Sequence, residues 1–288
     1  MYRIHRKEVI APGVTRTVVE APRIARRRKP GQFVIVRLYE EGERIPLTIV
    51  DADPGQGTIT LISQRVGKST AYLETLSAEE GILDVAGPLG HPAEISDAKN
   101  VVCIGGGIGV APIFPIAQAF RRNGSRVVSI IGARTKELII LADEMRSVSD
   151  QVHIITDDGS SGRKGFVTDA LRELVEGGEK FDQAVAIGPI PMMAATAKLT
   201  RELGIPTMVS LNSLMVDGTG MCGACRVTVG GETRFTCVDG PEFDGHKVDF
   251  EELMHRVQMF RDMDRTALEA FEKQHANPGC AKKVNPSA

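Results

Sequence analysis

The chain has 288 residues, of which 42% are hydrophobic and 25% charged, and its formal net charge at pH 7 is −2. This near-neutral balance argues against a nucleic-acid partner, because no large basic field is present. No apolar stretch approaches the roughly 20 residues that span a bilayer, and residues 1–16 contain no hydrophobic signal core. We therefore expect a soluble cytoplasmic protein without a membrane partner.

Residues 1–97 are predicted to form an antiparallel β-barrel. Short apolar runs at residues 31–38, 47–50 and 58–62 are separated by turn signals, several of them Pro-Gly pairs. Many short strands at this spacing are typical of barrels. One helix is expected to begin near Ser69 and Thr70.

Residues 23–29 contain five basic residues out of seven. A solvated loop is the simpler interpretation, because a Pro-Gly turn follows directly. A docking patch for an acidic partner such as ferredoxin is the alternative.

Two segments of the barrel region have the chemistry of a flavin-nucleotide site. The guanidinium of Arg44 can pair with a pyrophosphate, and the hydroxyl of Thr48 can reach the edge of a flavin ring. Residues 66–70 form a glycine turn at a helix N-terminus, where free amides, hydroxyls and the helix dipole suit a phosphate. Ordinary loop roles are the alternative, since Arg-x-Pro is common in loops. The candidate residues are Arg44, Pro46, Leu47, Thr48, Val66, Gly67, Lys68, Ser69 and Thr70.

Residues 98–211 are predicted to form a doubly wound α/β domain. Buried strands alternate with amphipathic helices, which indicates a parallel sheet. The strands are expected at 101–104, 127–131, 152–156, 184–187 and 207–211, and the helices at about 109–123, 136–147, 166–176 and 191–203. Ligands of such sheets bind beyond the carboxyl ends of the strands.

The turns after these strands indicate a nicotinamide-nucleotide site. The glycine-rich run 105–109 follows the first strand and opens a helix, although it lacks the last glycine of G-x-G-x-x-G. A plain tight turn is the alternative. Arg134, at the end of the second strand, favours a 2′-phosphate and hence NADP(H). The candidate residues are Gly105, Gly106, Gly107, Gly109, Arg134, Asp157, Asp158, Gly188 and Pro189.

Residues 212–249 contain the spacing Asp217-x4-Cys222-x2-Cys225, followed by Cys237 after eleven residues. With Cys in place of Asp this is the plant-type pattern of a [2Fe–2S] cluster. The alternative is a structural zinc site completed by Asp217 or His246. A disulfide framework is disfavoured by five cysteines, an odd number, without a signal peptide. Cys103 and Cys280 are expected to play no part in the site.

Residues 250–288 are predicted to be a helical, then disordered, tail. Apolar residues recur in it at helical spacing, from Phe250 to Phe271. They either pack against the chain's own domains or dock onto a larger subunit.

Together these motifs resemble the ferredoxin-reductase superfamily. Within it the chain is most similar to the small-subunit family of NADH-dependent ferredoxin:NADP oxidoreductases, also called the sulfide dehydrogenase beta subunit type. The resemblance implies FAD at residues 44–48 and 66–70, with Thr48 tuning flavin N5, and a nicotinamide nucleotide at the strand ends. It implies a [2Fe–2S] cluster on Asp217 and the three cysteines, because an Asp takes that ligand place in this family. It further implies NAD(H) as the nucleotide, a larger flavin and iron–sulfur subunit in a heterodimer, and ferredoxin reached through that complex.

Two other functions stay open at this point. One is the electron-transfer subunit of dihydroorotate dehydrogenase B, a related family that uses four cysteines and tends to a Cys where Ile187 stands here. The other is a zinc-stabilised nucleotide-binding regulator without a redox role. The sequence names neither the final acceptor nor whether electrons are bifurcated.

Overall fold

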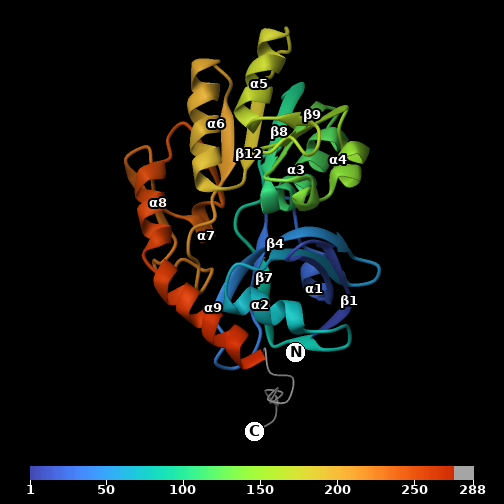
Figure 1. Ribbon diagram of the computed structural model, residues 1–288, viewed down its shortest axis with the longest axis vertical. Coiled ribbons are helices and arrows are strands. Elements are labelled where there is room, and N and C mark those ends of the chain that lie inside the picture. Colours follow the sequence, from blue (N-terminus) through green and yellow to red (C-terminus); the bar gives the residue numbers. More distant parts are fainter. Residues whose placement is uncertain (276–288) are drawn as a thin grey trace.

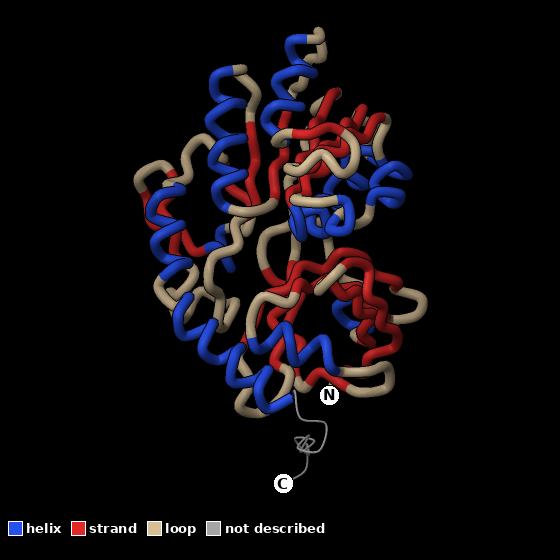
Figure 2. Tube along the Cα trace, viewed as in Figure 1, coloured by secondary structure: helices blue, strands red, loops and turns tan. Residues whose placement is uncertain are grey.

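The structure, a computed structural model, describes residues 1–275 of the chain. Figure 1 shows an α/β domain above a barrel, with the last two helices running down one side of both. Figure 2 shows most of the strands gathered in these two bodies and most of the helices around them. None of the helices in residues 1–275 is long and apolar enough to cross a membrane.

The lower body is a nearly closed antiparallel barrel, as predicted. Its seven strands follow the order β6-β1-β2-β5-β4-β3-β7, so the two edge strands are consecutive in the chain. Buried aliphatic side chains such as Ile4, Ile49 and Leu61 fill its interior. The elements are β1 (Tyr2–Ala11), β2 (Val14–Glu20), α1 (Pro22–Ala25), β3 (Phe33–Arg37), β4 (Arg44–Asp53), β5 (Thr58–Gln64), α2 (Lys68–Thr75), β6 (Gly81–Ile82) and β7 (Asp84–Leu89).

The basic segment 23–29 differs from the expected solvated loop. It begins within the short helix α1, whose Ile24 is buried in the barrel core. The side chain of Arg28 is only 11% exposed and pairs with Asp51 at 3.0 Å. The loop interpretation is wrong for this part of the segment, because periodicity over seven residues does not reveal a single helical turn.

The upper body is a doubly wound α/β domain, also as predicted. Its sheet has the order β11-β10-β9-β8-β12-β13-β16, and all of its strand pairs are parallel except β13 with β16. Helices α3 and α4 cover one face, and α5 and α6 cover the other (Figure 1). The elements are β8 (Asn100–Gly106), η1 (Gly107–Gly109), α3 (Val110–Arg122), β9 (Arg126–Ala133), η2 (Lys136–Leu138), α4 (Ala142–Val148), β10 (Gln151–Thr156), β11 (Arg163–Lys164), α5 (Val167–Glu176), β12 (Gln183–Ile187), α6 (Ile190–Glu202) and β13 (Thr207–Ser210).

The segment after β13 forms a small hairpin and then returns to the large sheet. It comprises β14 (Arg226–Val229), β15 (Glu232–Phe235), α7 (Thr236–Asp239) and β16 (Glu242–Asp244). Two helices follow, α8 (Phe250–Gln258) and α9 (Arg261–His275), in agreement with the helical tail predicted there. The disordered end predicted for the tail, with Cys280, lies outside the described residues.

Helix α3 joins the two bodies. Its buried residues Ile113 and Phe120 lie in one hydrophobic cluster with Val14, Val50 and Ile62 of the barrel. In the sheet β8 lies between β9 and β12. The strands that follow β8 in the chain are therefore added first on one side of it and then on the other. This switch point is where doubly wound sheets bind their ligands.

Candidate cofactor-binding site

Strand β4 changes partner halfway along its length. Residues 44–48 pair with β3 and residues 49–53 pair with β5, so the first half has hydrogen-bond partners on one edge only. Pro46 is tolerated there because its missing N–H falls on a strand edge. The half-buried hydroxyl of Thr48 has no hydrogen-bond partner among the described residues. An open backbone edge with a free hydroxyl is therefore available to a ligand.

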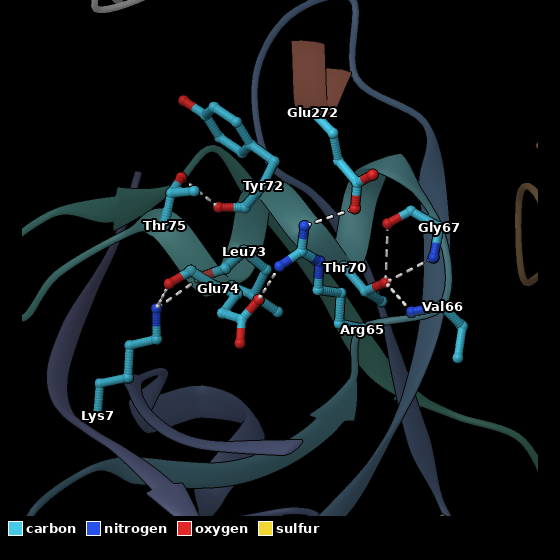
Figure 3. Close-up of polar contacts among 10 residues, drawn as sticks. All are labelled: Lys7, Arg65, Val66, Gly67, Thr70, Tyr72, Leu73, Glu74, Thr75 and Glu272. Carbon is cyan, nitrogen blue, oxygen red and sulfur yellow. Dashed lines mark hydrogen bonds and ion pairs between the residues drawn. The ribbon is translucent and has the colours of Figure 1, made fainter. Parts of the chain in front are cut away.

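The turn at residues 66–70 is tied to helix α2 by its own threonine. The Oγ1 atom of Thr70 accepts hydrogen bonds from the amides of Val66, at 3.0 Å, and Gly67, at 3.1 Å (Figure 3). The hydroxyl of Ser69 donates to Glu43. The expectation of free amides is thus wrong for positions 66 and 67, because Thr70 caps them.

Two cations near this turn lack acidic partners. Arg44 is exposed, and neither it nor Lys68 forms an ion pair with a residue in the part of the chain described. The ammonium of Lys68 lies 5.7 Å from the centre of the Tyr39 ring. By contrast Arg37, beside Arg44 on β3, is neutralised by Asp84 at 2.6 Å. Unpaired cations at a helix N-terminus suit a phosphate group.

In the glycine run after β8, some glycines are packed closely against neighbouring residues and one faces open space. A Cβ on Gly109 would lie 2.2 Å from the carbonyl oxygen of Ile187, and one on Gly106 would lie 2.2 Å from the Met192 sulfur. Gly105 likewise packs against Val110. Gly107 has φ +55°, and a Cβ added to it would have no neighbouring atom within 4 Å, so its backbone faces open space. Gly107 is the member of the run with room for a ligand against its backbone.

The other predicted residues lie at the same rim of the sheet. Gly188 and Pro189 follow β12, and a Cβ on Gly188 would lie 3.1 Å from the carbonyl oxygen of Gly106. Arg134 follows β9 and is exposed, without an ion pair among the described residues. After β10, Asp158 accepts hydrogen bonds from the hydroxyl and amide of Ser160, which lower the pKa of Asp158. The chain thus brings its nucleotide candidates together at the switch point.

The four predicted metal ligands lie in two pairs. The Asp217 carboxylate accepts a hydrogen bond from the Cys222 thiol at 2.9 Å, and the sulfurs of Cys225 and Cys237 are 3.2 Å apart. Nowhere in residues 1–275 do three or more His, Cys, Asp or Glu side chains gather as they would around one metal ion. His246 instead contacts Thr200 at 3.0 Å. Two pairs match two irons with two ligands each better than one tetrahedral zinc.

The backbone around these ligands turns tightly at three glycines in the left-handed region. Gly218, Gly220 and Gly223 have φ of +76°, +83° and +68°. These values require glycine, and they curl residues 217–225 into a tight loop. Hydrogen bonds from Cys222 and the Thr219 hydroxyl hold the pKa of Asp217 well below its usual range, so the carboxylate is anionic.

The second ligand pair is buried against the barrel. Cys225 and Cys237 are each 1% exposed and lie in one hydrophobic cluster with Phe33 and Ile35 of β3. Burial and the contact with Cys225 raise the pKa of the Cys237 thiol, so a bound metal must displace its proton. Cys222 is the exposed member of the set.

Comparison with known proteins agrees with this arrangement. Residues 103–198 match the oxidoreductase NAD-binding domain, and residues 212–249 match the iron–sulfur cluster binding domain of dihydroorotate dehydrogenase B. A dihydroorotate dehydrogenase B (NAD(+)) electron transfer subunit homolog from Thermotoga maritima is 47% identical over 94% of this chain and 95% of its own length. The electron transfer subunit from Bacillus caldolyticus is 38% identical over 77% of this chain and 87% of its own.

The chain belongs to the family of dihydroorotate dehydrogenase B electron transfer subunits and their homologues.

A solved structure narrows the comparison within this family. A chain from an NADH-dependent reduced ferredoxin-NADP oxidoreductase, studied for flavin-based electron bifurcation, has a TM-score of 0.89 and 45% identity. The match covers 94% of this chain and 98% of that one. The predicted resemblance to both groups is therefore confirmed, as is the ferredoxin-reductase-like fold.

Sequence reasoning missed Phe33, Ile35 and Glu242. Phe33 and Ile35 lie in one hydrophobic cluster with the buried cysteines and pair in the ladder with Thr48 and Pro46, so the cysteines lie close to the strand that carries the flavin candidates. The continuous apolar run of β3 signals burial on both faces of the strand but not what lies against it. Glu242 follows Pro241 on β16, and its Oε1 atom is buried without a hydrogen-bond partner in the described structure. No local sequence signal predicts that.

Proposed function

We propose that this chain is the FAD- and [2Fe–2S]-containing subunit that moves electrons between NAD(H) and a larger partner subunit. One observation carries the proposal. The buried ligand pair Cys225 and Cys237 packs on Phe33 and Ile35, whose ladder partners are Thr48 and Pro46. Neighbouring strands lie about 4.8 Å apart, so the β3 residues that contact the cluster ligands lie directly beside the flavin candidates on β4. Such proximity suits electron transfer between two bound groups.

The residues of the barrel fit FAD. Arg44 and Lys68 supply positive charge and form no ion pair within the described residues, and helix α2 offers its N-terminus to the pyrophosphate. The unpaired edge at residues 44–48 can accept the flat flavin ring, and the Thr48 hydroxyl can donate to its edge. When bound, FAD converts the two electrons of a hydride donor into the single electrons that an iron–sulfur cluster carries.

The residues of the loop fit a [2Fe–2S] cluster. Asp217 with Cys222 would hold one iron, and Cys225 with Cys237 the other, in keeping with the two pairs at 2.9 and 3.2 Å. The pairing weighs against the zinc-stabilised regulator, which needs four donors around one ion. Asp217 is an anionic oxygen ligand and so compensates for the missing thiolate charge.

The rim of the α/β sheet would bind the nicotinamide nucleotide. Gly107 offers open backbone at the start of α3, and Asp157 and Arg134 lie on the neighbouring strand ends. The relatives from Thermotoga and Bacillus are named for NAD(+), which supports NAD(H) here over the NADP(H) suggested by Arg134. The protein's task is to orient the nicotinamide against the flavin and exclude water.

Electrons would leave on the exposed side of the loop. Met221 is 87% exposed beside Cys222, and Leu214 and Val216 are exposed close by in the chain. We propose this apolar face as the contact with the larger subunit, because it lies where the cluster comes nearest to solvent. A heterodimer that serves ferredoxin, located in the cytoplasm, would complete the proposed complex.

The second candidate is the electron transfer subunit of dihydroorotate dehydrogenase itself, as several relatives are named. Two residues favour the ferredoxin:NADP oxidoreductase type instead. Asp217 stands in the first ligand place, and Ile187 precedes Gly188 and Pro189.

Anaerobic titration of the purified chain with NADH tests the proposal. We expect flavin absorption bands and a broad cluster absorption that bleach together, and a cluster EPR signal on reduction. A protein without bound flavin, or one whose flavin is reduced while the cluster stays oxidised at all NADH levels, would contradict it. Co-purification then identifies the partner and so decides between the two oxidoreductase types.

A further inference from the structure

The last two helices form a strap between the proposed cofactor sites. We call α8 and α9 the C-terminal strap; both lie beyond the two matched domains, which end at residue 249. At its start, Leu253 is buried against the α/β domain, and Arg256 donates to the carbonyl of Ala224 at 3.2 Å, next to Cys225. The strap then runs down to the barrel and ends beside α2 (Figure 1).

Two adjacent residues attach the end of the strap to the barrel. Phe271 is 7% exposed, and its ring meets the ring of Tyr72 on α2 edge-on at 6.3 Å. His275 stacks on the Phe271 ring at 3.9 Å. The residue after Phe271, Glu272, pairs with Arg65 at 2.7 Å (Figure 3). The rest of α9 is largely exposed, so these contacts hold it.

Arg65 directly precedes the turn 66–70. Its guanidinium lies between Glu272 of the strap and Glu74 of α2, at 2.7 and 3.4 Å. Figure 3 shows the Arg65 guanidinium beside Thr70, the residue whose hydroxyl oxygen accepts from the amides of Val66 and Gly67. The strap therefore contacts α2 at the base of the turn and, through Tyr72, on its outer face.

The other contacts of helix α2 come from the barrel: Leu73 is buried in the barrel core, and the Tyr72 ring also meets the Tyr39 ring edge-on at 5.0 Å. At its C-terminus the ammonium of Lys7 donates to the carbonyls of Leu73 and Glu74, at 2.8 and 2.6 Å. At its N-terminus the cap is Thr70. Both of these come from the barrel domain, whereas the strap comes from the far end of the chain. The helix is short, eight residues, and such a helix depends on tertiary contacts for its stability.

We propose that α9 positions the FAD-binding turn, with Phe271 and Glu272 as positioning residues, so that retention of FAD depends on the C-terminal strap. The inference rests on the proposed function, because it takes residues 66–70 and Lys68 as part of the FAD site. A turn held in its binding conformation loses less freedom when the phosphate arrives. Releasing α9 leaves Tyr72 without the Phe271 ring and Arg65 without its closest carboxylate.

The test measures how fast bound FAD leaves the full-length holoprotein, followed by the rise in free flavin fluorescence after dilution. Phe271→Ala is expected to accelerate release about tenfold. Glu272→Gln removes an exposed ion pair and is expected to accelerate it about two- to threefold. Phe271→Tyr keeps the ring contact and should release FAD at nearly the wild-type rate.

Matched controls lie on the same strap. Phe260→Ala removes a ring that is 42% exposed, and Glu269→Gln removes a carboxylate that makes no ion pair with a described residue. Both should keep the wild-type rate. Iron per chain should be unchanged in every variant, which reports that the fold is intact. If Phe271→Ala loses iron, the rate of FAD release from Glu272→Gln is the deciding measurement.

The inference is overturned if Phe271→Ala releases FAD at the wild-type rate. If Phe271→Ala loses iron, a wild-type rate of FAD release from Glu272→Gln overturns it instead. The inference is also overturned if Phe260→Ala releases FAD as fast as Phe271→Ala. Failure of the proposed function gives a different result. If residues 44 and 68 are not part of the FAD site, Arg44→Ala and Lys68→Ala leave the rate of FAD release unchanged. If the wild-type chain binds no FAD, both the proposed function and the role of α9 are overturned.

Discussion

Asp217 is the residue that distinguishes this site from an all-cysteine cluster. Its carboxylate lies 2.9 Å from the Cys222 sulfur, in the place of a thiolate. Ligand identity sets the potential of an iron–sulfur cluster, and exchange of thiolate for a neutral ligand raises it in Rieske centres. A carboxylate keeps the negative charge but donates less electron density to iron than a thiolate does, so we expect it to raise the potential by less than a neutral ligand.

Asp217→Cys should therefore lower the midpoint potential of the cluster, on the order of 100 mV. Redox titration followed by EPR measures the change. An unchanged EPR signal and potential would rule out Asp217 as a ligand.

Thr48 offers the flavin edge a hydroxyl that nothing else in the described structure uses. Thr48→Val keeps the shape and the ladder pairing with Phe33 but removes the donor. Loss of one hydrogen bond costs about 1 kcal/mol, so hydride transfer should slow about fivefold while FAD stays bound. Stopped-flow reduction by NADH measures this, with Thr48→Ser as the control that keeps the hydroxyl. A Thr48→Val protein that retains FAD and reacts at the full rate refutes the role.

Among the elements, the junction of β8 and α3 depends on a close approach that only glycine allows. A Cβ on Gly109 would lie 2.2 Å from the Ile187 carbonyl oxygen and 2.8 Å from the Gly188 Cα. Backbone at this distance cannot yield as a flexible side chain can, so α3 would have to move away from β12.

Gly109→Ala should lower the free energy of unfolding by about 3 kcal/mol, at the upper end of overpacking costs. Gly107→Ala meets no atom and should lose only about 1 kcal/mol from its φ of +55°. Thermal or urea unfolding of the two variants compares them. Equal losses would mean that the packing of the glycine run is not what the structure indicates.

At the scale of the whole molecule, a buried carboxyl lies where the barrel, the α/β sheet and the cluster segment meet. Glu242 pairs through the ladder with Ser210 on β13, and a Cβ on Gly31 of the barrel would lie 2.7 Å from its Oε1. Burial raises the pKa of Glu242 to about 8, and the buried Cys103 thiol is a titratable group that interacts with it. The group is thus protonated in the folded protein at neutral pH.

This shift has a defined sign. Between its unfolded value of 4.5 and about 8, the folded chain binds a proton that the unfolded chain has lost. The contribution of Glu242 is therefore fully present below pH 4.5 and is lost as pH rises toward 8, by about 1.4 kcal/mol per pH unit.

Glu242→Gln should remove that slope. Urea unfolding at pH 5.0 to 7.5 is expected to show a wild-type stability that falls more steeply with pH than the variant's. Parallel pH profiles for the two proteins would show that Glu242 is ionised in the folded state.

Features that depend on residues close together in the sequence could be predicted, and contacts between residues far apart in the chain could not. Strand and helix alternation predicted the sheet, and the spacing of Asp217 and the cysteines singled out four residues that the structure places in two pairs. The packing of Phe33 on Cys225 joins residues almost two hundred positions apart, and no periodicity encodes it. The capping of the 66–70 turn by Thr70 and the contact of Phe271 with Tyr72 were missed because both depend on side-chain placement in the folded chain. The domain boundaries at 97, 211 and 249 and the cofactor roles of the site residues stay predictions.

We expect the two donor pairs to hold two irons beside strand β4, which carries the flavin candidates. Iron, zinc and acid-labile sulfide per chain, measured on anaerobically purified protein, test it most directly. We expect two iron atoms and two sulfides per chain with no stoichiometric zinc. One zinc per chain without sulfide would contradict the account.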